Sequence, residues 1–251
     1  MKRQGAQQVP RTPGGARERL SRAGLSWALT VAAVVGLWVT SSTEVAAAQS
    51  GWEVIDRTDG VVVSTRFVPQ YELPIIRGVG MVEGNIYDVL AVLADVERNK
   101  EWMHSCRDSK LLKQQDDLVR IIYNRTATPW PVDDRDAVVK ATIKPDMEKK
   151  TVTISFQSIK SPLMGEVEGV IRMPKLKGFY LLEKIDEGRT RVTYQAEADV
   201  GGIIPAWLAE LNSKDIPLKT ILSLRAQVKK TKGSYKDFLD KWDPKRGGQG
   251  F

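Results

Sequence analysis

The stretch PWPVDDRDAVVKATI, residues 129–143, combines a tight turn with the beginning of a strand. Pro129 and Pro131 each fix the backbone angle φ and remove a hydrogen-bond donor, which predicts a stiff turn around Trp130. The β-branched residues of the segment 137–143 predict a strand that follows at once. The acidic residues and the arginine between turn and strand leave three interpretations open: a metal site, a catalytic loop, or a rigid corner that aims the strand.

Metal and catalytic sites need residue types that are scarce in this chain. His104 and Cys106 are the only histidine and cysteine, which argues against a zinc site. Asp133, Asp134 and Asp136 lack the central glycine and distal glutamate of a calcium loop. No serine lies in a G-x-S-x-G context, and the sequence has no glycine-rich phosphate loop. We therefore predict no catalytic residue, no metal and no cofactor.

Strand signals dominate the chain on both sides of this stretch. The segments with β-branched or alternating composition, separated by turn residues, are residues 60–67, 75–82, 110–113, 118–125, 137–143, 151–158, 166–173, 178–185 and 189–198. Several of them are joined in pairs by short turns such as Gln114-Gln115-Asp116-Asp117. Consecutive hairpins of this kind predict an antiparallel, strongly curved sheet.

Two segments change to the spacing of a helix. Residues 86–93 place their apolar side chains on one face, and Asn85 is a suitable N-cap. Residues 207–228 predict a long amphipathic helix that kinks or restarts at Pro217. A long helix laid across a curved sheet leaves a space between them, filled either by side chains or by a ligand. The pattern alone leaves both alternatives open.

The first 48 residues do not resemble the rest of the chain. Three arginines precede an uncharged apolar run over residues 25–39, and Ala46-Ala47-Ala48 follows. This order is typical of a secretory signal peptide with a basic leader, so we expect cleavage after Ala48 and export to the periplasm. The alternative is an anchor formed by the uncleaved segment. About fifteen residues rise only ~22 Å as a helix, however, which is less than the ~30 Å hydrocarbon core.

The basic charge of the chain belongs mostly to this leader. The whole chain carries a net charge of +7, and residues 1–48 contain six basic and two acidic residues, so the remainder carries only +3. That excess is too small to favour a nucleic-acid partner. The remaining length, about 200 residues, suits a single domain with a substantial core. We expect a monomer.

Three motifs in the mature chain resemble those of the StAR-related lipid-transfer (START) domain family. They are Glu101-Trp102, then Pro129-Trp130-Pro131 with Arg135-Asp136, then the segment 201–208 continued by Pro217-Leu218-Lys219-Thr220-Ile221. The resemblance covers residues 52–232, leaves residues 233–251 as a C-terminal tail, and suggests an exported bacterial member. It implies an α+β helix-grip fold (START-like, SRPBCC), in which a curved antiparallel sheet wraps around a long C-terminal helix and encloses a hydrophobic cavity.

The resemblance also assigns a role to the opening stretch. It implies that Pro129, Trp130, Pro131, Arg135 and Asp136 form a structural corner rather than a catalytic loop. In this reading Arg135 bridges carboxylates or carbonyls to hold the turn, and Asp136 begins the strand.

The function implied by the resemblance is non-catalytic binding and transfer of a lipid or other hydrophobic small molecule, with transient contact to a membrane surface. The candidate tunnel residues are Trp102, Met103, Tyr123, Asn124, Met173, Tyr194, Trp207, Leu208 and Leu211. We expect the segment 207–211 to act as a lid hinged by Gly201, Gly202 and Pro217. Trp207 is expected either to anchor the lid at a membrane or to pack under the helix. A cyclase- or aromatase-like enzyme and a ligand-sensing module are the alternatives for the same cavity.

One departure from the family bears on the ligand. Sterol-binding members carry a second arginine six residues beyond the arginine of the corner, and this chain has Ala141 there. The strand before the corner offers Tyr123 and Asn124 where an acid is required. The sequence therefore argues against a sterol bound in the same manner.

Overall fold

The structure is a computed structural model that describes residues 51–69 and 72–250. The expected signal peptide, its cleavage site after Ala48 and the alternative anchor lie outside these residues. Within them, no helix is both long enough and apolar enough to cross a membrane.

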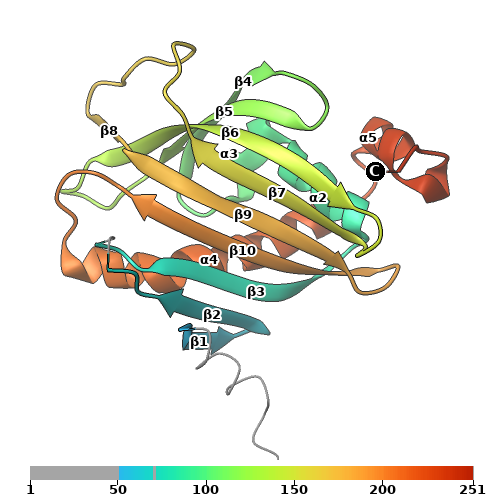
Figure 1. Cartoon of the computed structure of the whole chain (residues 1–251), viewed down its shortest axis with the longest axis horizontal. Helices are drawn as coiled ribbons and strands as arrows, with labels where there is room; N and C mark the ends of the chain where they lie inside the picture. Colours follow the sequence, from blue (N-terminus) through green and yellow to red (C-terminus); the bar gives the residue numbers. More distant parts are fainter. Residues whose placement is uncertain (1–50, 70–71, 251) are drawn as a thin grey trace, which may run out of the picture. The chain divides into compact units, whose positions relative to one another are not determined.

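The described chain forms one sheet and a set of helices (Figure 1). The strands are β1 (Glu53–Thr58), β2 (Val61–Arg66), β3 (Ile75–Glu83), β4 (Cys106–Gln114), β5 (Val119–Thr126), β6 (Asp134–Asp146), β7 (Thr151–Ser158), β8 (Val170–Arg172), β9 (Lys175–Lys184) and β10 (Arg189–Asp199). The helices are α2 (Ile86–Ala94), η1 (Val96–Arg98), α3 (Asn99–Trp102), α4 (Ala206–Lys230), α5 (Lys236–Trp242) and η2 (Pro244–Arg246).

The sheet is antiparallel in the order β1-β2-β3-β10-β9-β7-β6-β5-β4, and β8 pairs in parallel with β6. It curves around the long helix α4, which packs against β2, β3 and β10 on the same side of the sheet as α2 (Figure 1). The predicted α+β helix-grip fold is thus confirmed. The strand expected over residues 166–173 is shorter than predicted, since only Val170–Arg172 is extended, and β1 is a strand that was not predicted.

Local interactions explain where α2 begins. The side chain of Asn85 accepts hydrogen bonds from the backbone N–H groups of Tyr87 and Asp88, each at 2.9 Å. The Asp88 carboxylate in turn accepts the backbone N–H of Asn85 at 3.3 Å. This reciprocal capping satisfies backbone donors that the first helical turn leaves unpaired, so the predicted N-cap is confirmed.

Glycines on β3 bring α4 close to the sheet. A Cβ atom built on Gly78 would lie 2.8 Å from the carbonyl oxygen of Pro217, and one built on Gly80 would lie 2.8 Å from Ile221. Helix α4 therefore packs on the bare backbone of β3. The helix continues through Pro217 without a break, so the restart considered in the sequence analysis does not occur.

The two halves of α4 have different surroundings. After Pro217, the side chains of Leu218, Ile221, Leu224 and Val228 are buried in the main core, together with residues of the sheet and of α2. Before Pro217, only Leu208 is buried. The second half of the helix is therefore held by the core, and the first half covers another part of the sheet.

Candidate functional site

A cavity of about 260 Å³ lies between the inner face of the sheet and the first half of α4. Its wall includes Ile154 and Phe156 from β7, Leu176 from β9, and Leu208 and Ile216 from α4. The cavity would hold on the order of ten to twenty water molecules. The interior of the protein is thus not filled by its own side chains at this point.

Three aromatic rings from neighbouring strands form one side of the cavity. The ring centroids of Tyr180 and Tyr194 are 4.9 Å apart, and Phe156 lies 6.1 Å from Tyr180 and 6.4 Å from Tyr194. Burial raises the pKa of both Tyr180 and Tyr194 above the usual tyrosine value. Both phenols are therefore uncharged at neutral pH, and this side of the cavity carries no charge.

Polar side chains form another side, beside α3 and along β4 and β5. Asn99 donates from Nδ2 to the Ser109 hydroxyl at 3.2 Å, and that hydroxyl donates to Oδ1 of Asn124 at 2.7 Å. Thr126, two residues after Asn124 on β5, also lines the cavity. The cavity therefore has an apolar and a polar side, as a site for an amphiphilic molecule requires.

Arg135 lies at the corner that begins β6 and lines the same cavity. Its Nη1 donates to the backbone carbonyl of Asp133 at 2.6 Å, and its Nη2 donates to that of Gly201 at 3.2 Å. Burial lowers the pKa of its guanidinium. Of the two contacts considered from sequence, carboxylates or carbonyls, the structure shows carbonyls, and one of them belongs to the expected lid hinge.

The aspartates on both sides of Arg135 are paired with other arginines. Asp134 lies 2.7 Å from Arg125 and 2.9 Å from Arg107, and Asp136 binds Arg172 through both of its carboxylate oxygens. The strand begins at Asp134 rather than at Asp136. Among the described residues, no group of three or more His, Cys, Asp or Glu side chains is placed to hold a metal ion.

The turn before this corner projects an aromatic side chain into solvent. The backbone N–H of Val132 donates to the carbonyl of Pro129 at 3.0 Å, and the Trp130–Pro131 peptide bond is cis. The side chain of Trp130 is 91% exposed. Trp130 therefore contributes nothing to the core, while the prolines shape the turn.

A wide groove of about 1290 Å³ adjoins the cavity on its outer side. Leu73, Pro74, Ala198, Val200, Ile204, Ala209 and Ser213 line both spaces. The groove also contains Gly201 and Gly202, whose φ angles of +63° and +64° are in the region that favours glycine. The segment from β10 into α4 therefore separates the cavity from the groove.

The nine candidate tunnel residues fall into three groups. Met103, Asn124, Met173, Tyr194 and Leu208 line the cavity. Trp207 and Leu211, which are 51% and 44% exposed, line the outer groove. The remaining two, Trp102 and Tyr123, line neither space.

Trp102 and Tyr123 are buried for other reasons. Trp102 is the last residue of α3, and its side chain is part of the main core. Tyr123 lies between the cavity-lining residues Ile122 and Asn124 on β5, so it points to the opposite face of the sheet. There it packs with Ile121 and Val138 under the segment that follows β7.

Several residues of the cavity wall were not predicted from the sequence. Ile154 and Phe156 alternate with polar residues in the predicted strand 151–158, and that alternation could have identified them as lining residues. Asn99 and His104, which also line the cavity, had no sequence signal of this kind. Burial lowers the pKa of His104, and the nearby Lys219 lowers it further.

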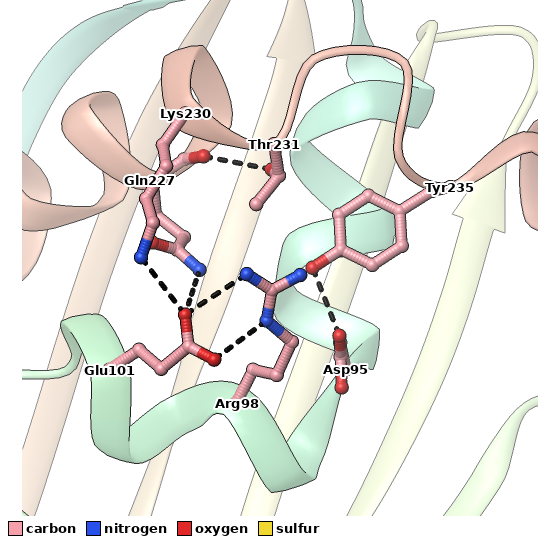
Figure 2. Close-up of polar contacts among 7 residues, drawn as sticks. All are labelled: Asp95, Arg98, Glu101, Gln227, Lys230, Thr231 and Tyr235. Carbon is pink, nitrogen blue, oxygen red and sulfur yellow. Dashed lines mark hydrogen bonds and ion pairs between the residues drawn. The ribbon is translucent and has the colours of Figure 1, made fainter.

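The far end of α4 is held by a polar cluster, shown in Figure 2. The carboxylate of Glu101 accepts from Arg98 at 2.9 and 3.0 Å, from Lys230 at 3.1 Å and from Gln227 at 3.4 Å. The hydroxyl of Tyr235, beyond the end of α4, donates to Asp95 at 3.0 Å. These contacts fix the C-terminal end of α4 to η1 and α3, at the end of the helix away from the cavity.

The sequence matches the START domain family over residues 39–232. This chain belongs to the START domain family. The match includes the corner at Arg135, the hinge glycines and all of α4, so the cavity just described lies within the family domain.

Known relatives agree with this assignment. The uncharacterised protein PA1579 of Pseudomonas aeruginosa is 34% identical, over 71% of this chain and 87% of its own length. A crystallised fragment of the STAR-related lipid transfer protein from Xanthomonas axonopodis is 30% identical with a TM-score of 0.66, covering 71% of this chain and 99% of the fragment. The human phosphatidylcholine transfer protein is 26% identical, over 68% of this chain and 80% of its own length.

Proposed function

We propose that this chain binds a lipid or other hydrophobic small molecule in the cavity under α4 and transfers it between membranes without catalysis. The observation that carries the proposal is the unfilled, mostly apolar space between the sheet and the first half of α4. Membership in a family that includes proteins named for lipid transfer supports it. We also propose, from the leader pattern of residues 1–48, that the chain is exported to the periplasm, and that it acts there as a monomer.

An empty cavity under α4 would lower the stability of the folded protein, so a bound molecule is favoured. Residual cavity volume costs about 24 cal/mol per Å³ in dry protein cores, so 260 Å³ left empty would cost at most on the order of 6 kcal/mol. Whole domains are stable by only about 5–15 kcal/mol. A hydrocarbon chain in the cavity offsets this cost, and the chain itself avoids about 0.8 kcal/mol of exposure per methylene.

The cavity is too small to hold a whole long-chain lipid. Pockets for drug-sized ligands measure roughly 300–1,000 Å³, and the cavity is slightly smaller at about 260 Å³. A long-chain lipid must therefore also occupy the adjoining groove or displace the first half of α4. Displacement of that half breaks few core contacts, because Leu208 is its only buried residue.

The proposed lid opens around the residues that join it to the rest of the protein. Gly201 and Gly202 supply backbone freedom at its start. At its end, Pro217 has no N–H to donate to the carbonyl of Ser213, which weakens the helix at that turn. Beyond Pro217, the main core and the polar cluster around Glu101 (Figure 2) keep the helix in place.

The outer side of the lid is suited to transient contact with a membrane surface. Ile203, Trp207 and Leu211 are exposed on and before the first turns of α4, and Phe67 is exposed on the facing wall of the groove. Tryptophan in particular favours the boundary between headgroups and hydrocarbon. These side chains would enter the membrane where the groove opens.

A vesicle assay tests the proposed function. Donor vesicles containing a fluorescently labelled phospholipid are mixed with unlabelled acceptor vesicles, and transfer is followed with and without the purified full chain. We expect faster transfer with the protein, a reduced rate for Trp207→Ser, and an unchanged rate for Met147→Ser. Met147 is a matched control, because it is 57% exposed in the turn at the opposite end of β6. Transfer no faster than in vesicles alone would overturn the proposal.

A further inference from the structure

Arg135 is a buried cation that forms no ion pair within the described chain, although the charge of Asp133 acts on it from a distance. Its side chain is only 4% exposed, and its hydrogen bonds go to two backbone carbonyls. None of the carboxylates in residues 51–69 and 72–250 forms an ion pair with it, since Asp134 and Asp136 pair with other arginines. A buried charge without a partner is unfavourable, and in proteins such charges are normally paired.

The Arg135 guanidinium also has an unused donor. Its Nε is buried and has no hydrogen-bond partner in the described chain. A guanidinium has five N–H groups, and the two contacts above use only two of them. Because Arg135 lines the cavity, a ligand there can accept the remaining hydrogen bonds.

Other polar groups lie next to this donor. Thr126 is the partner of Arg135 across the β5–β6 pair, and Asn124, two residues before Thr126, lines the same wall. Asn99, linked to Asn124 through Ser109, has a buried Oδ1 atom without a partner in the described residues. The wall thus places the Arg135 cation near the Thr126 hydroxyl and the Asn124 amide. The unpaired Oδ1 of Asn99 is a hydrogen-bond acceptor further along the same wall.

The position of Arg135 fixes the orientation of an amphiphile. Its Nη2 contacts Gly201, and Gly201 lines the outer groove, so Arg135 lies where the cavity meets the groove. The apolar side, with Phe156 and Tyr180, lies further along the sheet, toward β9. A hydrocarbon chain against the aromatic rings would place its charged end at Arg135.

We infer that Arg135 binds an anionic oxygen of the ligand, so that the cavity prefers lipids with a phosphate or carboxylate group over uncharged lipids with the same chains. This inference rests on the proposed function and adds the chemical class of the ligand. A guanidinium suits both anions, because its planar N–H groups match two oxygens at once.

The test compares two lipids that differ only in their phosphate. The full chain is incubated with vesicles containing equal amounts of phosphatidic acid and diacylglycerol with identical acyl chains, reisolated, and its bound lipid quantified by mass spectrometry. A hydrogen bond to a charged group contributes enough for a preference of about tenfold to a hundredfold for phosphatidic acid. A fatty acid against its alcohol repeats the comparison for a carboxylate.

Variants test whether Arg135 causes the preference for phosphatidic acid. In Arg135→Gln the preference should vanish while diacylglycerol uptake stays, and in Arg135→Lys part of it should remain. Arg191→Gln, which removes an exposed arginine from β10, should keep the wild-type preference. If Arg135→Gln does not fold, the wild-type comparison of the two lipids still decides the inference.

The outcomes separate the inference from the proposed function. Equal uptake of both lipids by the wild type would overturn the anion site and leave the proposed function standing. Uptake of neither lipid would overturn the proposed function itself. Inorganic phosphate alone distinguishes a lipid headgroup from a free anion. We expect it to leave the melting temperature unchanged, and stabilisation equal to that by phosphatidic acid would contradict a lipid site.

Discussion

The contact between Gly78 of β3 and Pro217 of α4 gives the sharpest prediction about how the helix is held. In Gly78→Ala the new methyl carbon would lie 2.8 Å from the Pro217 carbonyl oxygen, 3.0 Å from its Cβ and 3.1 Å from its carbonyl carbon. These are atoms of the helix backbone and of a rigid ring, so no side chain can rotate away. To restore an ordinary contact of 3.4 Å, the helix must recede from the strand by about 0.6 Å.

The expected cost follows from two opposing effects. Overpacking of a filled interior costs about 1–3 kcal/mol. Replacement of a glycine within a strand returns roughly 0.5–1 kcal/mol, because the unfolded chain loses freedom. The free energy of unfolding should therefore fall by about 1–2 kcal/mol. With a urea slope of about 1–3 kcal/mol per M, the midpoint of unfolding shifts down by roughly 0.3–2 M.

Urea unfolding followed by tryptophan fluorescence measures this shift. Gly165→Ala is the matched control, because a Cβ at Gly165 meets no atom within 4 Å and its φ is not in the left-handed region. The control should leave the midpoint unchanged or raise it slightly. A Gly78→Ala protein as stable as the wild type would refute the conclusion that α4 packs directly on the backbone of β3.

Three further predictions concern the hinge, the polar cluster and the cavity. Gly202→Ala forces a side chain into φ of +64° and toward Ile171, so unfolding should become easier by about 1 kcal/mol or more, and a calorimetric scan measures it. Hydrogen bonds lower the pKa of Glu101 to about 2, and the one from Arg98 has a larger effect than the one from Lys230. The ionised Glu101 therefore stabilises the folded protein fully above about pH 4.5, and this stabilisation is lost as the pH falls toward 2. In Glu101→Gln, this part of the dependence of stability on pH should disappear. Ala196→Phe, at a buried wall position, should reduce bound lipid in extracts without a large loss of stability, and an unchanged lipid content would contradict the assigned wall.

Most of the fold could be predicted because its signals are local. Alternation on β7 and the capping residues of α2 each depend on a few neighbouring residues, and both agree with the structure. The faces of β5 could not be predicted in the same way. Ile121, Ile122 and Tyr123 are all buried, because the segment after β7 covers the outer face of the sheet. Without alternation, the sequence does not show that Asn124 faces the cavity and Tyr123 faces away from it.

The role of Arg135 needed contacts between distant parts of the chain. Its neighbours Asp134 and Asp136 are sequence-adjacent acids, which made an ion pair with Arg135 plausible. In the structure Arg125 and Arg107 bind the first and Arg172 binds the second. Because neither aspartate pairs with Arg135, the Nε–H of its guanidinium stays available to a ligand in the cavity.

The central claim is that the space under the first half of α4 holds the hydrocarbon of another molecule. Native mass spectrometry of the chain, purified without detergent after incubation with vesicles, tests it most directly. We expect a mass increase corresponding to one lipid per protein molecule, and its reduction in Ala196→Phe. A spectrum that shows only the mass of the protein, whatever lipid is offered, would contradict the claim.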